Sequence, residues 1–109
     1  MTVTQLIDTL QLEILNAGDL SRTVTGGYCG DLLSHVMGKA TVDNVWFSVM
    51  GNVNAIAVCV LTEVACLVLT DNAPLDEAAK FRAQAENVTV LRSTRSTYDL
   101  AAELGRLSV

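Results

Sequence analysis

The chain has 109 residues, of which 50% are hydrophobic and only 5% aromatic, and its formal net charge is −5. This length predicts one domain over residues 1–109, with a core made mainly of aliphatic side chains. The 7 Lys and Arg residues are scattered along a chain that carries 12 acidic ones, whereas proteins that hold nucleic acid or an anionic membrane cluster their basic side chains. The composition therefore argues against both as partners.

The N-terminal segment MTVTQLIDTL has neither the basic region nor the cleavage site of a secretory signal. The most apolar run, residues 53–69, is interrupted by a Thr-Glu pair and is too short to span a membrane. We therefore expect a cytoplasmic protein. Cys29, Cys59 and Cys66 are odd in number and two of them lie in apolar runs, which predicts reduced, buried thiols.

The N-terminal part of the chain predicts one helix, one strand and a long connection. Thr2 and Gln5 form a capping box ahead of an apolar helical stripe, and residues 12–14 alternate like a short strand. No periodicity is visible from residue 16 to residue 30. A connection of roughly 14 residues favours a functional or interface role, because loops in compact domains are mostly shorter.

The rest of the chain alternates between helices and strands. We expect a helix over 31–37 that ends at Gly38 in a left-handed cap. It is followed by a strand at 45–50, a helix from the Asn52 cap to about 62, a strand at 64–70, a helix with Pro74 in its first turn and a stop at Asn87, a strand at 88–91, and a helix from the Ser96 cap. Right-handed crossovers convert this order into an α/β fold, a mainly parallel sheet of four to five strands with helices on both faces.

Three burial patterns follow from these elements. The helix over 53–61 is apolar nearly all round, which predicts burial on several sides and contributes to the expectation of a homodimer. Trp46 and Phe47 should lie on opposite faces of their strand. The helix that follows Pro74 should turn one side inward, formed by Leu75, Ala78, Phe81 and Ala85.

The stretch RTVTGGYCGD, residues 22–31, is the candidate ligand site. A Gly-Gly pair permits positive φ and a close approach of backbone amides to a bound group, and the start of the next helix adds positive potential. Arg22 can give an anion a bidentate contact. The predicted ligand-binding residues are Arg22, Thr23, Thr25, Gly26, Gly27, Tyr28, Gly30 and Asp31. Two interpretations stay open: a nucleotide or phosphate site, or a structural turn or subunit contact in which Asp31 caps the helix.

The same stretch resembles the signature of the DRTGG domain family. The matching residues are Arg22, Thr25, Gly26, Gly27, Tyr28, Gly30, Asp31, Leu32, Leu33, Ser34, Val36 and Met37. The acidic residue that the family name places directly before the arginine is Ser21 here, and Asp19 lies two positions earlier. The predicted order of strands and helices also fits the family, so that the resemblance covers essentially the whole chain.

The resemblance implies a regulatory or oligomerising module, similar in fold to the N-terminal domain of HPr kinase. DRTGG domains also occur between the CBS domains of some pyrophosphatases and in front of phosphotransacetylase domains. Stand-alone copies of this size resemble those encoded beside iron-only hydrogenase maturation and electron-bifurcating components. A hydrogenase-associated or other redox enzyme is therefore an alternative partner.

Catalysis and metal binding lack the residues that they need. A P-loop kinase requires G-x-x-x-x-G-K-[ST], but Gly38 and Lys39 are followed by Ala40, and no glycine stands five positions before Gly38. Asp31, Ser34 and His35 have no supporting constellation of acid, base and nucleophile. No pair of Cys or His residues has the spacing of a zinc or cluster site, so neither a metal nor a cofactor is expected.

A second basic pair, Arg92 and Arg95, flanks the last strand-to-helix turn. These side chains can bind an anion together with the helix start at Ser96, although surface arginines are common at such turns. The sequence thus predicts a non-catalytic regulatory domain that is a homodimer and binds a nucleotide or phosphate at residues 22–31. The alternative is a protein-interaction module that docks on a redox or metabolic enzyme and binds no small molecule.

Overall fold

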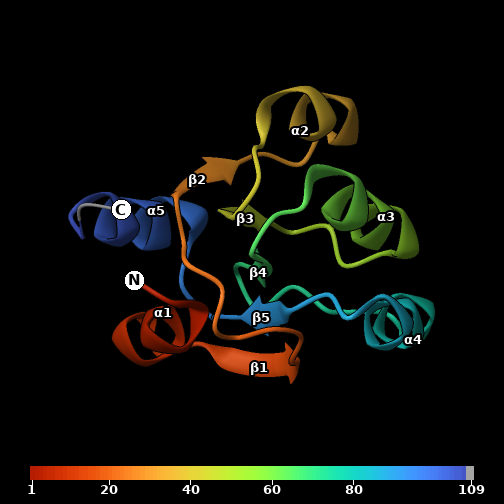
Figure 1. Ribbon diagram of the computed structural model, residues 1–109, viewed down its shortest axis with the longest axis horizontal. Helices are drawn as coiled ribbons and strands as arrows, with labels where there is room; N and C mark the ends of the chain where they lie inside the picture. Colours follow the sequence, from red (N-terminus) through yellow and green to blue (C-terminus); the bar gives the residue numbers. More distant parts are fainter. Residues whose placement is uncertain (108–109) are drawn as a thin grey trace.

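The structure, a computed structural model, describes residues 1–107, which form a five-stranded sheet between two layers of helices (Figure 1). The strands are β1 (Glu13–Asn16), β2 (Gly26–Cys29), β3 (Asn44–Ser48), β4 (Cys66–Leu69) and β5 (Val90–Arg92). One face is covered by α1 (Val3–Leu10) and α5 (Thr97–Gly105), and the other by α2 (Leu33–Lys39), α3 (Val53–Thr62) and α4 (Glu77–Glu86). No helix in the described residues is long and apolar enough to cross a bilayer.

The strand order, β1-β5-β4-β3-β2, confirms the predicted α/β fold with a mainly parallel sheet. β2, β3, β4 and β5 run parallel, and β1 pairs antiparallel with β5. β1 and β2 are consecutive in the chain but form opposite edges of the sheet. The segment 17–25, which we name the crossing segment, therefore passes across the whole sheet between them (Figure 1).

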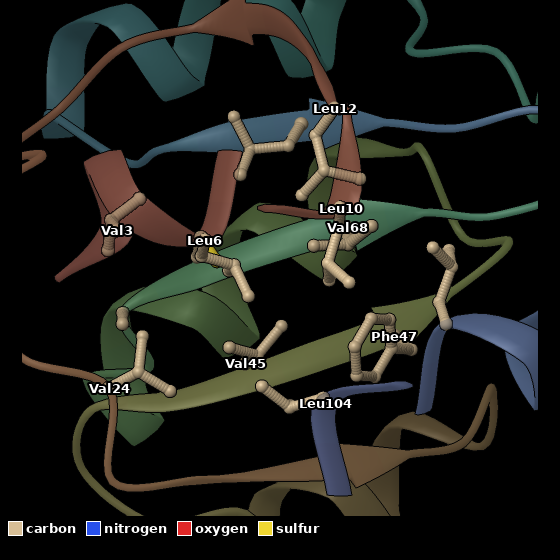
Figure 2. Close-up of a cluster of buried hydrophobic side chains, with 13 residues drawn as sticks. Val3, Leu6, Leu10, Leu12, Val24, Val45, Phe47, Val68 and Leu104 are labelled. Atoms are coloured by element: carbon tan, nitrogen blue, oxygen red, sulfur yellow. The ribbon is translucent and has the colours of Figure 1, made fainter. Parts of the chain in front are cut away.

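Alternating side chains of the central strands divide the core into two clusters. Val45 and Phe47 pack under α1 and α5 together with Leu104 (Figure 2), whereas Trp46 packs under α2 and α3. This confirms the prediction that Trp46 and Phe47 lie on opposite faces. β4 is buried on both faces, which is the physical reason for its uninterrupted apolar run.

Most of the apolar surface of α3 is covered by other elements of the same chain. α3 lies between α2 and α4, so its flanks as well as its inner face contact neighbouring elements. Val60 and Leu61 remain exposed, at 39% and 70%. The all-round hydrophobicity of this helix therefore does not by itself require a second subunit.

Several helix boundaries are confirmed by their hydrogen bonds. Thr2 and Gln5 form the predicted capping box, and the side chains of Asn52 and Ser96 accept the N–H of Ala55 and Asp99 at the starts of α3 and α5. The left-handed stop predicted for α4 is also present at Asn87, whose φ is 58°. These side chains satisfy backbone groups that the end of a helix otherwise leaves unpaired.

The predicted bounds of α2, which begins at Leu33 and not at residue 31, and the predicted start of α4 were wrong. α2 does not stop at Gly38: it continues to Lys39, and Ala40 leaves the helix in an extended conformation while its N–H still reaches the Val36 carbonyl. Pro74 lies ahead of α4 rather than in its first turn. The cause is Asp76, which caps the helix at Ala79 N (2.8 Å) and is itself held by the Gly51 carbonyl (3.0 Å).

The buried side of α4 also differs from the prediction. Ala79 and Ala83 are fully buried, whereas Ala78 and Ala85 are exposed and Phe81 is 75% exposed. Methyl side chains let α4 approach the neighbouring α3 closely, and a phenyl ring at the contact would push the helices apart. The largest apolar side chain of this helix therefore faces outward.

Candidate functional site

The glycine pair of the candidate stretch lies in a strand rather than in an open loop. Residues 26–29 form β2, which corrects the expectation of an unstructured connection from 16 to 30. The Thr25 N–H donates to the Asp43 carbonyl (3.1 Å) and the Gly30 N–H donates to the Phe47 carbonyl (3.2 Å), one at each end of the ladder with β3. This backbone is an extended strand that pairs with β3 on one side, and it does not form the loop that a cradle of amides requires.

Packing explains why small residues occupy these positions. A Cβ on Gly27 would lie 3.1 Å from Leu104 Cδ2 of α5 and 3.3 Å from the Val45 carbonyl oxygen. A Cβ on Gly30 would lie 3.0 Å from the ring of Tyr28. Because Gly27 has no side chain, α5 can lie directly on the edge strand. The glycine stretch therefore shapes a contact between a helix and a strand.

Arg22 binds the protein's own chain. Its Nε donates to Asp43 Oδ1 (2.8 Å), its Nη1 donates to the Val64 carbonyl (2.9 Å), and its Nη2 reaches both Asp43 Oδ1 (2.6 Å) and the Glu63 carbonyl. Glu63 is the C-cap of α3, where unpaired carbonyls and the helix dipole favour a cation. Arg22 thus ties the crossing segment to the end of α3.

The two threonines next to Arg22 are also engaged in backbone contacts. Thr23 forms an antiparallel bridge with Thr2, ahead of α1. The hydroxyl of Thr25 donates to the Val42 carbonyl (2.9 Å) in the turn that precedes β3. Both residues therefore help to hold the crossing segment in place.

Asp31 does not cap α2, which corrects the second sequence-based interpretation. Its carboxylate accepts the Ser48 hydroxyl (2.7 Å) and the Val49 N–H (3.0 Å) at the end of β3. The N-cap position of α2 is Leu32, whose side chain makes no capping hydrogen bond. Asp31 therefore links the exit of β2 to the exit of β3.

The eight predicted ligand-binding residues are thus spread over the crossing segment, β2 and the two residues that follow it, and they are not gathered in one hollow. The hollow beside Gly26 and Gly27 is apolar, with Phe47 and Leu104 in its lining, and the hollow that includes Arg22 lies near the ends of α3 and α4. The ligand-binding function of these residues stays a prediction. In this structure most of the Arg22 donors are engaged by Asp43 and by the Glu63 and Val64 carbonyls.

An apolar groove lies between β2 and α5, which we name the β2–α5 groove. Two adjoining hollows that share Cys29 and Ala101 form it, and their lining includes Gly27, Tyr98 and Leu104. Tyr98 is 79% exposed. Burial and the nearby charge of Asp31 raise the pKa of the Cys29 thiol, so that the groove carries no ionised side chain at neutral pH.

The predicted burial of the thiols is confirmed for Cys59 and Cys66 but not for Cys29, which is exposed. Cys59 and Cys66 are buried and free, and burial raises the pKa of both, that of Cys66 to about 12. A buried neutral thiol behaves as a small hydrophobic side chain. Among residues 1–107, no group of three His, Cys, Asp or Glu side chains is arranged to hold a metal ion.

The sequence pattern of the DRTGG domain matches residues 5–107. This chain belongs to the DRTGG domain family. No curated protein matches its sequence. Among solved structures, the DRTGG domain described here is similar to the CBS and DRTGG domains of the regulatory region of Clostridium perfringens pyrophosphatase, complexed with the activator diadenosine tetraphosphate, with a TM-score of 0.72 and 14% identity. The match covers 99% of this chain and 47% of that one, and it shows a shared fold.

The part that α5 contributes to the β2–α5 groove was not predicted from the sequence of this DRTGG domain. Leu100 and Leu104 face the core, while Tyr98, two residues before Leu100, is exposed. The sequence did contain an indication of this surface. Tyr98 and Ala102 are uncharged residues four positions apart in the last predicted helix of an acidic chain. An exposed aromatic residue beside small neighbours is typical of contact surfaces.

Proposed function

We propose that this DRTGG domain is a non-catalytic regulatory domain, that residues 1–109 act as one unit, and that it works as a homodimer formed through the β2–α5 groove. The observation that carries this proposal is the free edge of β2, which pairs with β3 on one side only. An unpaired strand edge is a template for another chain, and proteins usually protect such edges with charged residues or proline. β2 has the sequence GGYC and carries neither.

The neutral lining of the groove is compatible with a second copy as its occupant. Each copy carries a formal charge of −5, so two copies repel each other overall, and this repulsion is smallest where the surfaces that meet carry no charge. The β2–α5 groove is such a surface. In a two-fold dimer every contact occurs twice, so that Tyr98 of each copy can fill the groove of the other and the two β2 strands can extend one sheet.

The fold neighbour supports a ligand as the regulatory signal. The regulatory region of the Clostridium perfringens pyrophosphatase was solved in complex with an activator, diadenosine tetraphosphate, and its chain includes a DRTGG domain of the same fold. We therefore propose that a nucleotide or another phosphate-bearing compound controls the present domain. The neighbour's chain is about twice as long, since the match covers 47% of it, so this part of the proposal is tested on this chain directly.

Tyr98→Asp tests the homodimer, with Phe81→Asp as its matched control. Both are aromatic side chains on helices, exposed by 79% and 75%, but Phe81 lies on α4, away from the groove. In sedimentation velocity we expect wild type and Phe81→Asp at twice the 11.6 kDa chain mass, and a dimer dissociation constant at least about tenfold higher for Tyr98→Asp. A monomeric wild type at about 100 μM, or equal effects of the two substitutions, contradicts the proposal.

The same groove also supports the alternative, a module that docks on a hydrogenase-associated or other redox or metabolic enzyme. In that case the chain is monomeric at every concentration tested. Tyr98→Asp then abolishes co-purification of the enzyme, whereas Phe81→Asp leaves it unchanged. Because both candidates use an apolar surface that would otherwise stay exposed, the oligomeric state of the wild type separates them.

A further inference from the structure

A polar hollow lies at the opposite edge of the sheet, where β5 ends and the chain turns into α5. Its volume is about 370 Å³, and its lining includes Gln11, Glu13, Asn72, Arg92, Thr94 and Arg95. This size lies within the range of small-molecule sites, about 300–1,000 Å³. In a chain of net charge −5 with 7 basic residues, two of these residues line the same hollow.

The hollow lies beside the carboxyl ends of two neighbouring parallel strands, β4 and β5. Ligands of open α/β sheets bind at such ends, outside the strands. The loops that follow the two strands are joined, because the Asp71 N–H donates to the Arg95 carbonyl (2.9 Å) and the Asn72 N–H donates to the Ser93 carbonyl (2.8 Å). The rim of the hollow is thus fixed before any ligand arrives.

The rim also contains unusual backbone. Asp71 and Asn72 are consecutive and both left-handed, with φ of 54° and 55°. Residues other than glycine adopt this conformation at a cost, which the hydrogen bonds to the neighbouring loop offset. The result is that Asn72 is held at the hollow, opposite the loop of Ser93 and Thr94.

The two arginines keep donors available. Arg92 contacts Glu13 through Nε (3.1 Å) and Nη2 (3.3 Å), and Arg95 contacts Glu103 through Nη1 (2.8 Å). A guanidinium has five N–H donors, so these contacts leave others for a second anion. Glu13 is 57% exposed and Arg95 is 40% exposed. Each ion pair thus has one partner open to water, and such pairs contribute little.

We propose that this hollow binds a small organic phosphate, with Arg92 and Arg95 on the phosphoryl oxygens and with Asn72 and Thr94 as neutral partners. Planar guanidinium forks match a phosphate dianion in charge and geometry. The inference rests on the ligand part of the proposed function and gives that ligand a site. It does not require the homodimer, because no residue lines both the hollow and the β2–α5 groove; Thr97 and Tyr98 of the groove follow Arg95 in the chain.

The test uses AMP and inorganic pyrophosphate as probes, titrated into the full chain at low salt and followed by calorimetry and by amide NMR. We expect saturable binding with shifts centred on Asn72 and Thr94. Arg92→Gln and Arg95→Gln should each weaken binding by at least about tenfold. Arg106→Gln, an exposed arginine outside the hollow, should change the affinity less than about twofold, and adenosine, which has no phosphate, should not bind.

A second variant acts in the opposite direction. Glu13→Gln removes the carboxylate that competes for Arg92, so pyrophosphate should bind severalfold more tightly. Glu86→Gln removes the same charge from the far end of α4, outside this hollow, and should leave the affinity unchanged. Equal gains in both variants would show a general charge effect and overturn the site.

The outcomes separate this inference from the function on which it rests. If the probes bind but the amide shifts lie at residues 22–31, and Arg92→Gln and Arg95→Gln bind normally, the hollow is not the site and the proposed ligand binding stands. If neither probe binds at about 10 mM, both fail, and the oligomeric state still tests the homodimer. The amide shifts of the wild type locate the ligand even where a variant does not fold.

Discussion

Arg22 lies at the amino ends of β3 and β4, and Arg92 lies at the carboxyl end of β5. The fold uses the two arginines differently. Arg22 follows the exposed residue Ser21 and precedes a glycine motif, yet its guanidinium binds Asp43 and the carbonyls at the end of α3. Arg92 binds a single carboxylate at a partly open hollow. The carbonyls at the end of α3 bind the Arg22 guanidinium as an external anion would. An arginine beside glycines therefore does not by itself indicate a ligand.

Among the substitutions that test this difference, Arg22→Ala should lower the free energy of unfolding most. It leaves the Glu63 and Val64 carbonyls and the Asp43 carboxylate without their donor, and we expect the free energy of unfolding to fall by about 2–3 kcal/mol. Arg22→Lys should recover only part of it, because an ammonium cannot form the same fork. Urea unfolding measures both. A loss no larger than that of Arg92→Ala would remove the distinction between the two arginines.

Gly27→Val should have the next largest effect, because it tests the contact between β2 and α5. The new side chain meets Leu104 and the Val45 carbonyl, and we expect a loss of about 1–3 kcal/mol from overpacking. Gly38→Ala is the control. That glycine lies inside α2 with nothing near an added Cβ, so alanine should stabilise the domain by up to about 1 kcal/mol. Thermal unfolding distinguishes the opposite signs.

The next prediction concerns a smaller effect, the rate at which a disulfide reagent labels the cysteines. A disulfide reagent should label one thiol of the native chain, Cys29, and all three thiols after unfolding. Because the pKa of Cys29 is raised, its thiolate is scarce at pH 8 and the rate should increase as the pH rises. Asp31→Asn removes the nearby negative charge, lowers the pKa and should speed the reaction severalfold.

The same reaction also reports on the proposed homodimer. Cys29 lines the β2–α5 groove, so labelling should slow down as the protein concentration passes through the dissociation constant of the dimer. A rate that does not depend on concentration in a chain that sediments as a dimer would place the interface elsewhere.

Glu13→Gln should have the smallest effect on stability. Glu13 pairs with Arg92 across β1 and β5, and its side chain is 57% exposed. Exposed ion pairs contribute little, so we expect a change below about 1 kcal/mol in urea unfolding. A larger loss would mean that Arg92 is held for structure, as Arg22 is, and would weaken the case for a ligand at the hollow.

The parts of the fold that the sequence predicted are those decided by local chemistry. The caps at Thr2, Asn52 and Ser96 each satisfy backbone groups within three residues. The buried run of β4 and the alternation at Trp46 and Phe47 also follow from the periodicity of side chains. Such features depend little on what the rest of the chain does.

The parts that the sequence did not predict depend on distant partners. Gly26 and Gly27 have low strand propensity, and they form β2 because β3 and α5 lie against them. The partners of Arg22 are about twenty and forty positions further along the chain. The apolar pattern of α4 placed Phe81 inside, whereas the buried positions of this helix are Ala79 and Ala83. None of these contacts leaves a periodic trace in the sequence.

The position of β1 has a consequence for how the domain forms during synthesis. Its partner strand contains Arg92, which is 79 positions from Glu13. A ribosome must therefore deliver the next 79 residues after Glu13 before β1 can complete its pairing with β5, and a contact of such long range slows folding. A nascent chain that stops short of residue 90 lacks β5, so β1 has no partner and β4 becomes an edge strand. We expect proteases to degrade this shortened product faster than the full chain.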